Sequence, residues 1–70
     1  MNFKVNDIVK IVSVDAFYYN ALGRVAEVND DEVYVVFEMI DTDTGEVSVY
    51  EDCYYYDYEV ELYEGGGEQW

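Results

Sequence analysis

The side chains in this sequence that could carry chemistry are carboxylates and tyrosines. The 70 residues include 17 Asp and Glu, 3 Lys and Arg, one Cys and nine Tyr, but no His. Without His the chain lacks the usual general base at neutral pH, and no Ser or Cys can be activated by one. The glycine-rich motif that cradles phosphates is also missing from the sequence. We therefore expect no enzymatic activity, no catalytic residue and no cofactor.

The acidic run from Asp41 to Glu46 is the part that most resembles a metal-binding loop. Counted from Asp41, a calcium loop needs Gly at the sixth position and Glu at the twelfth, where this chain has Glu46 and Asp52. The run Asp-Thr-Asp-Thr-Gly-Glu is instead typical of a hairpin turn. Cys53 is the single cysteine, so it cannot form an internal disulfide, and no Cys/His zinc set exists. We expect no metal site.

Charge is distributed unevenly along the chain. Lys4, Lys10 and Arg24 are the only bases, whereas residues 25–70 contain 15 acids and no base. A globule of this length is roughly 28 Å wide, and duplex DNA carries about 16 charges over that width. The formal net charge of −14 is comparable. Two interpretations remain open: a solvated acidic face that provides solubility or salt adaptation, and a carboxylate array that imitates nucleic-acid phosphates.

The carboxylates must be positioned by strands, and the clearest strand signal is a central hairpin. Two β-branched runs within Leu22–Phe37 flank the polar block Asn29-Asp30-Asp31-Glu32, a pattern that predicts a hairpin. Val25 and Val28 cannot share one face of a regular strand, so we expect a bulge or a strand end near Glu27.

In the second arm of this hairpin the side chains alternate between two faces. The alternation places Val33, Val35, Phe37 and Met39 together on one wholly apolar face.

Short strands and turns account for the rest of the chain. The expected elements are a first strand within Lys4–Val14 after a turn at Asn6 and Asp7, an aromatic loop over Asp15–Ala21, a strand at Val47–Tyr50, a helical turn or irregular corner over Glu51–Asp57, and a closing strand at Tyr58–Tyr63. In the closing strand, Tyr58, Val60 and Leu62 should point inward, with Glu59 and Glu61 outward. With no Pro and no amphipathic helix, this all-β pattern favours a small, bent antiparallel barrel.

The order of these segments resembles a known group of folds. Asp7–Ile11, Gly23–Val28, Val33–Phe37 and the closing Tyr58–Leu62 are similar to SH3-like barrels of the KOW type. Tyr18-Tyr19-Asn20 before Gly23-Arg24-Val25-Ala26 also resembles the SH3-like accessory subunits of photosynthetic electron transport, photosystem I subunit IV (PsaE) and NdhS. The resemblance implies a five-stranded SH3-like antiparallel barrel over residues 1–63, followed by a flexible tail, 64–70. Family members that dock RNA or acidic ferredoxin would present bases, which this chain lacks after Arg24.

Tyrosines and carboxylates on the hairpin and the closing segment are the candidate partner-binding residues. Tyr58 and one or two of Tyr54, Tyr55 and Tyr56 are expected in the core or at a corner, and the other tyrosines at the surface. If the closing strand runs beside the hairpin, the acids form one continuous anionic surface. The candidate residues are Glu27, Asp30, Asp31, Glu32, Glu38, Glu51, Asp52, Asp57, Glu59, Glu61, Tyr18, Tyr19 and Tyr55.

These features predict a non-enzymatic, cytoplasmic, acidic protein-binding module. The expected partner is a basic surface on a nucleic-acid-binding protein, as for a phage or mobile-element inhibitor that mimics nucleic acid against a restriction, CRISPR or transcription component. We expect no direct nucleic-acid binding and no membrane insertion, because no apolar run approaches the roughly 20 residues that span a bilayer. An exposed strand edge would be compatible with a homodimer. The alternative is an accessory subunit, similar to PsaE or NdhS, that docks on a photosynthetic electron-transport complex.

Overall fold

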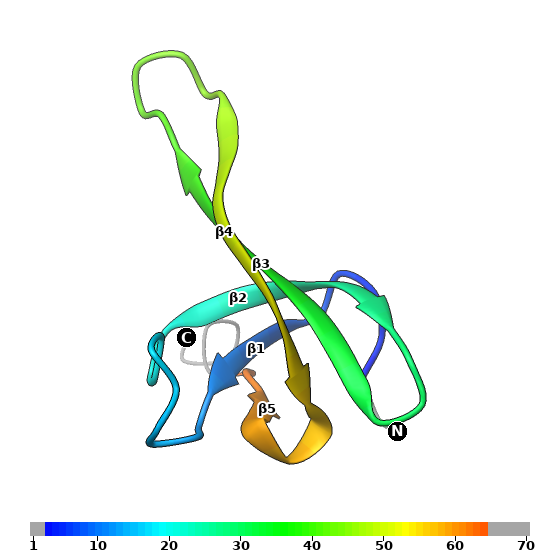
Figure 1. Ribbon diagram of the computed structural model, residues 1–70. Helices are drawn as coiled ribbons and strands as arrows, with labels where there is room; N and C mark the ends of the chain where they lie inside the picture. The colour runs from blue at the N-terminus through cyan, green and yellow to red at the C-terminus, as the bar shows by residue number, and fades with distance from the viewer. Residues whose placement is uncertain (1–2, 65–70) are drawn as a thin grey trace.

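Five antiparallel strands and one short helical turn form residues 3–64 of the protein (Figure 1). The computed structural model describes residues 3–64 of the chain. The elements are β1 (Ile8–Ile11), β2 (Leu22–Val28), β3 (Glu32–Ile40), β4 (Val47–Tyr56), the 3-10 turn η1 (Asp57–Glu59) and β5 (Val60–Leu62). The strands lie in one sheet in the order β4-β3-β2-β1-β5. The predicted all-β class is therefore confirmed, whereas the predicted tail, 64–70, lies outside the described residues except for its first residue.

The sheet is strongly bent but does not close into a complete ladder. Each neighbouring pair of strands is antiparallel, and β4 and β5 lie at the two ends of the strand order. η1 connects these two end strands, yet no ladder joins them within residues 3–64. This arrangement is compatible with an SH3-like barrel, and what the structure shows is an open five-stranded sheet. No helix in this part of the chain is long and apolar enough to cross a membrane.

The predicted central hairpin is present as β2 and β3. Val28 pairs with Val33, and the N–H of Asn29 donates to the carbonyl of Glu32 at 2.8 Å. The register shifts between Val25 and Glu27, which confirms the predicted bulge. Because one extra residue is accommodated there, both Val25 and Val28 can pack toward the core.

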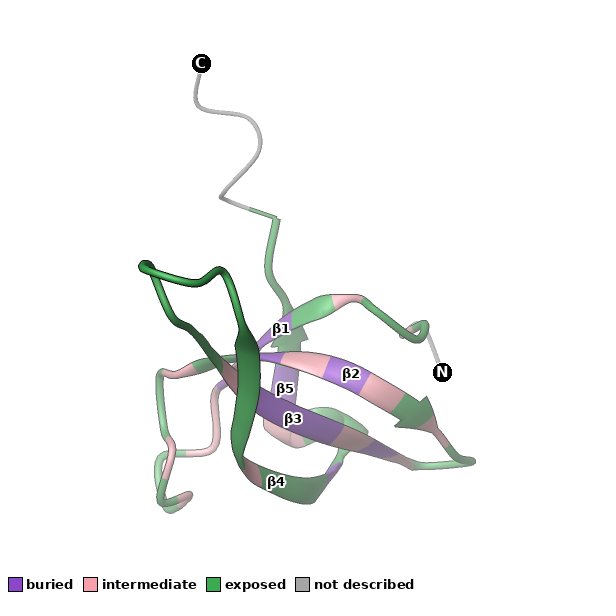
Figure 2. Cartoon of the chain, turned by 90° about the horizontal axis from the view of Figure 1, so that it is seen from above, coloured by how far each residue is buried: buried purple, intermediate pink, exposed green. Residues whose placement is uncertain are grey.

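The core lies on the concave inner face of the sheet and receives side chains from all five strands. Strand alternation explains the set, because every second residue points to the same face. Figure 2 shows the buried positions in purple. Those that form the core cluster are Val9, Ile11, Val25, Val33, Val35, Phe37, Tyr55 and Val60, and Gly23 and Val36 are buried as well.

Gly23 lies where β2 crosses the core closely. A Cβ at this position would come within 2.4 Å of Val35 Cγ1 and 3.0 Å of Phe37 Cε1, and both of those side chains are fully buried. The position therefore requires glycine because there is no room for a side chain.

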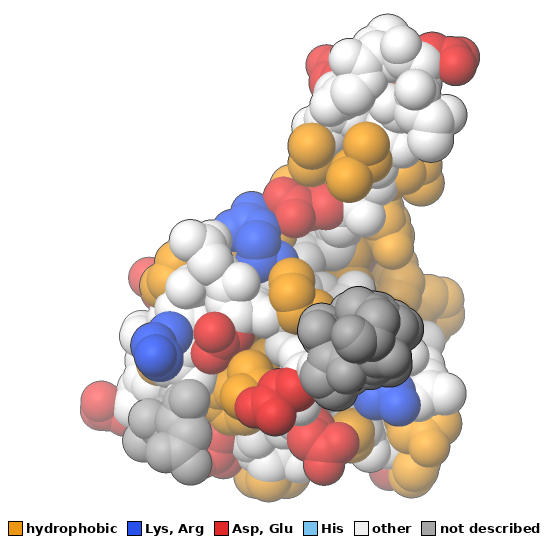
Figure 3. All heavy atoms as spheres, turned by 180° about the vertical axis from the view of Figure 1, so that it is seen from behind, with side chains coloured by type: hydrophobic (Ala, Val, Ile, Leu, Met, Phe, Trp, Pro, Cys, Tyr) orange, Lys and Arg blue, Asp and Glu red, His pale blue; other side chains and the backbone are white. Residues whose placement is uncertain are grey.

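Beyond this core the β3–β4 hairpin projects into solvent as an arm, defined as residues 39–48 (Figures 1 and 3). Every residue of the arm is exposed. Met39 belongs to the predicted apolar face with Val33, Val35 and Phe37, yet it is 61% exposed whereas those three are buried. The reason is that β2 pairs with β3 only as far as Val36, so no strand covers the arm.

The segment predicted as an irregular corner is strand for most of its length. β4 continues to Tyr56, and only Asp57–Glu59 forms a helical turn. The long ladder with β3 extends the strand through residues whose local pattern is not distinctive. Tyr58 therefore lies in η1 and is 74% exposed, contrary to its predicted inward position. Leu62 is also exposed, and Val60 alone of the three is buried.

Candidate functional site

The face of the sheet opposite the core carries a group of aromatic and acidic side chains. Directly opposite residues in an antiparallel ladder share a face, and the register pairs Tyr34 with both Tyr54 and Glu27, and Glu32 with Tyr56. Asp52 lies two residues before Tyr54 on β4, on the same face. We call this group, together with Tyr58 of η1, the tyrosine–carboxylate cluster: Glu27, Glu32, Tyr34, Asp52, Tyr54, Tyr56 and Tyr58.

Two tyrosines at the centre of the cluster are held by carboxylates. The rings of Tyr34 and Tyr54 lie 4.7 Å apart between centroids. The hydroxyl of Tyr34 donates to Asp52 Oδ2 at 2.5 Å, and that of Tyr54 donates to Glu27 Oε1 at 3.3 Å. The hydrogen bond to Asp52 raises the pKa of Tyr34 to about 12, and the charge of Glu27 raises the pKa of Tyr54. Both phenols therefore stay neutral at physiological pH.

A second aromatic pair continues the cluster toward η1. The rings of Tyr56 and Tyr58 stack at 5.5 Å with 6° between their planes. Glu59 Oε1 accepts a hydrogen bond from the N–H of Tyr56 at 2.9 Å, which fixes the entry into η1. Tyr56 is 46% exposed, so this stacked pair presents ring surface to solvent.

Carboxylates from two neighbouring loops lie beside the cluster. Asp30 and Asp31 form the β2–β3 turn, and the N–H of Asp57 donates to the carbonyl of Asp31 at 2.9 Å. Within residues 3–64, no Lys or Arg makes an ion pair with any of these acids. The structure thus gathers six of the predicted acidic residues at one end of the sheet: Glu27, Asp30, Asp31, Glu32, Asp52 and Asp57.

Of the other four predicted acids, Glu59 lies beside the cluster, where it accepts the hydrogen bond from Tyr56, but Glu38, Glu51 and Glu61 lie elsewhere, so the predicted anionic surface is not continuous. Its continuity required the closing strand to run beside the hairpin, but β5 pairs with β1. Glu61 consequently lies opposite Lys10. Glu51 lies opposite Phe37, next to the irregularity in the β3–β4 ladder. Glu38 is paired with Arg24.

The three tyrosines singled out from the sequence are not part of the cluster. Tyr18 is half-buried and stacks on Phe37 at 4.9 Å, and burial raises its pKa. Tyr19 is exposed in the loop before β2. Tyr55 is 6% exposed in the core, where burial raises its pKa to about 12.

Sequence reasoning missed the tyrosines that do form the cluster, Tyr34, Tyr54, Tyr56 and Tyr58. Strand alternation could have found Tyr54 and Tyr56 if the aromatic run had been interpreted as strand, because they flank Tyr55.

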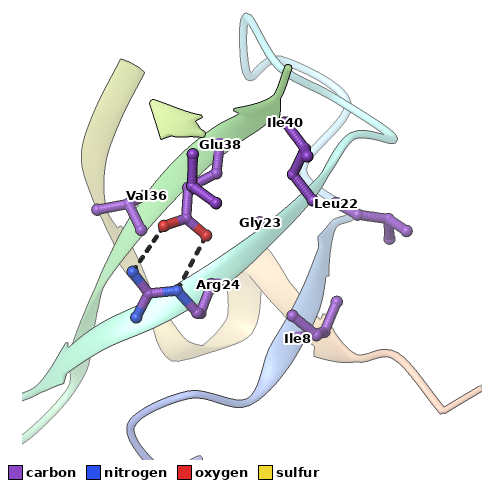
Figure 4. Close-up of a pocket in the computed structure, with 8 residues that line it drawn as sticks. Ile8, Leu22, Gly23, Arg24, Val36, Glu38 and Ile40 are labelled. Carbon is purple, nitrogen blue, oxygen red and sulfur yellow. Dashed lines mark hydrogen bonds and ion pairs between the residues drawn. The ribbon is translucent and has the colours of Figure 1, made fainter. Parts of the chain in front are cut away.

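An apolar cavity of about 270 Å³ lies on the same outer face, between β1, β2 and the base of the arm (Figure 4). Arg24 spans its side, donating to Glu38 Oε1 from Nε at 3.0 Å and to Oε2 from Nη2 at 2.8 Å. These hydrogen bonds lower the pKa of Glu38, and the pair is electrically neutral. The apolar lining residues are Ile8, Leu22, Val36, Ile40 and Val47. The outer face is therefore apolar at one end and anionic at the other.

Comparison of the chain with protein-family models, curated proteins and solved structures found no match. Within residues 3–64 there is no group of three or more His, Cys, Asp or Glu side chains placed to hold a metal ion. The chemistry that the outer face offers is hydrogen-bond acceptance by carboxylates beside exposed aromatic rings.

Proposed function

We propose that the protein is a non-enzymatic, cytoplasmic binding module whose tyrosine–carboxylate cluster occupies a basic site on a nucleic-acid-binding protein. Its carboxylates would take the Lys and Arg contacts that phosphates otherwise make, so the mechanism is competition. The biological role that fits this chemistry is an inhibitor from a phage or mobile element. The observation that carries the proposal is a group of tyrosines and acids on one sheet face, in which no acid is paired with a base within residues 3–64.

The chemistry of arginine explains why a basic protein is the best partner for this face. A guanidinium pairs with a carboxylate through two hydrogen bonds and also stacks on tyrosine rings. Tyr and Arg, together with Trp, are enriched among the residues that contribute most of the binding energy at protein interfaces. The net charge of −14 accelerates encounter with a cationic surface and repels phosphate backbones.

Charge reversal at two places on the molecule tests the proposal. The first variant, Asp30→Lys with Glu32→Lys, changes the anionic end of the outer face. The matched control, Asp43→Lys with Glu46→Lys, makes the same change in net charge at the tip of the arm. Within residues 3–64 none of these four carboxylates accepts a hydrogen bond, so both variants should fold, as circular dichroism will show.

Each protein is then immobilised for capture from host lysate at low salt and eluted with rising salt. We expect the wild type and the control to capture nucleic-acid-binding proteins that duplex DNA displaces, and the first variant to lose them. Equal capture by both variants would contradict the proposed surface. A salt-insensitive complex with electron-transfer subunits would favour the accessory-subunit alternative.

A further inference from the structure

β4 is an edge strand, and within residues 3–64 no strand pairs with its outer edge. It is the first strand in the sheet order and the longest, with ten residues. Most of the strand is exposed, as the green ribbon of β4 in Figure 2 shows. An unpaired edge of this kind presents backbone N–H and C=O groups to which another extended segment can bind.

The hydrogen-bond pattern identifies which backbone groups are free. The N–H of Asp57 donates to the carbonyl of Asp31, and bonded pairs recur every second residue along an antiparallel ladder. Tyr55 and Cys53, opposite Val33 and Val35, therefore turn their N–H and C=O groups toward β3. Residues 52, 54 and 56 turn theirs toward the open edge.

Two contacts agree with this assignment. Glu59 Oε1 accepts a hydrogen bond from the N–H of Tyr56, outside the ladder, and the carbonyl of Tyr54 accepts one from the thiol of Cys53, at 3.4 Å. The register turns the N–H groups of Asp52 and Tyr54 away from β3, and outside the strand ladders no group in residues 3–64 accepts a hydrogen bond from either of them. Both side chains belong to the tyrosine–carboxylate cluster, so the free backbone groups and the anionic side chains lie at one place.

We propose that the open edge of β4 at residues 52–56 binds an extended basic segment of the partner as an added antiparallel strand. This inference rests on the proposed function and specifies how that partner binds. In an added antiparallel strand, the residues bonded to Asp52 and Tyr54 share their face of the sheet. Arginines at those two positions would pair with the carboxylate of Asp52 and lie beside the ring of Tyr54.

Charge selects this occupant over a second copy of the chain. Two copies would each bring a net charge of −14, and pairing of two β4 edges would bring Glu51, Asp52 and Asp57 of both chains together. Like charges on adjacent strands destabilise their pairing. The irregularity in the β3–β4 ladder between Phe37 and Glu38 limits the added strand to the segment after Glu51.

The test uses a synthetic heptapeptide of alternating Arg and Val and two methylated forms of equal charge. One form carries N-methyl groups on two central arginines, which removes the peptide N–H groups that would bond to β4. The control form carries them on two central valines, whose N–H groups would point away. Calorimetric titration should show binding of the parent and control peptides and an affinity about thirtyfold lower for the Arg-methylated peptide, from two lost backbone hydrogen bonds.

Amide hydrogen exchange at Asp52 and Tyr54 provides a second readout. We expect exchange at both to slow at least about tenfold when the parent peptide binds. Equal affinity of the two methylated peptides, unchanged exchange, or no binding of the parent would each overturn strand addition. If hydrogen exchange at these two amides slowed when the protein concentration was raised without peptide, the result would overturn binding of a basic segment and favour a second copy of the chain.

The Asp30→Lys, Glu32→Lys variant separates this inference from the proposed function. One outcome is that the variant loses affinity for the parent peptide while the wild type binds the two methylated peptides equally well. That outcome would refute strand addition alone and leave the basic-site proposal standing. Undiminished affinity in the variant would contradict the proposed surface itself.

Discussion

Replacement of Gly23 by Ala tests the packing of β2 against the core. The new Cβ would lie 2.4 Å from Val35 Cγ1 and 3.0 Å from Phe37 Cε1. Neither side chain has free volume to move into, because both are fully buried. Overpacking of this kind costs about 1–3 kcal/mol, out of roughly 4–10 kcal/mol expected for a domain of this length.

Urea unfolding followed by circular dichroism measures this loss. With a urea dependence of about 1 kcal/mol per molar, the midpoint should fall by roughly 1–3 M. If the variant does not fold, Val35→Ala in the same chain provides the second measurement, because it removes the methyl group that the new Cβ would meet. We expect Gly23→Ala to cost less in the Val35→Ala background, with a coupling of at least about 0.5 kcal/mol.

Two results would refute this reasoning. One is a change in the free energy of unfolding below about 0.5 kcal/mol for Gly23→Ala, which is the range of an ordinary surface substitution. The other is strict additivity with Val35→Ala.

Three further predictions concern the Tyr34–Asp52 hydrogen bond, the Arg24–Glu38 pair and the arm. In Asp52→Asn the pKa of Tyr34 should fall from about 12 toward 10.0, as ultraviolet titration of the phenolate, with Tyr34→Phe as the reference, will show. Because folding raises the pKa of Tyr34, the hydrogen bond to Asp52 stabilises the wild type below pH 10.0, and this stabilisation is lost as pH rises toward 12. Glu38→Gln should lower the free energy of unfolding slightly at neutral pH, because the pair with Arg24 is lost, and should leave it unchanged in acid. The reason is that folding lowers the pKa of Glu38 from 4.5, so the stabilisation disappears as pH falls through the lowered value. Equal urea midpoints of variant and wild type at neutral pH would contradict this. Gly45 has φ +78 with open space around it, so Gly45→Ala should cost about 1 kcal/mol through backbone conformation and Gly45→Asn less in the same urea assay; equal losses would contradict the backbone explanation.

Local sequence signals were sufficient for the central hairpin. The polar block between two β-branched runs predicted the β2–β3 turn, and the spacing of Val25 and Val28 predicted the bulge. The turn over Asp41–Glu46 was also predictable, and the structure shows the N–H of Gly45 bonded to the carbonyl of Asp41 at 2.7 Å. These features depend on residues close in sequence, so a local pattern is enough to specify them.

The course of β4 could not be obtained in this way. The run from Glu51 to Tyr56 has no clear alternation of apolar and polar residues, since three consecutive tyrosines occupy both faces. Only pairing with β3 assigns Tyr55 to the core and Tyr54 and Tyr56 to the outer face. The site in the structure consequently contains different tyrosines from those predicted, while six of the ten predicted acids lie together.

The sequence alone determined the acidity of the protein, its lack of a histidine-based catalytic set and its all-β character, because these follow from composition and short-range pattern. The tertiary structure decided which carboxylates share a surface. Val60 is buried by pairing β5 with β1, beside Ile11, and that pairing carries Glu61 away from the hairpin. Such long-range pairing is selected by the burial of apolar side chains in a common core. The positions of the charged residues in the sequence therefore do not reveal which strands pair.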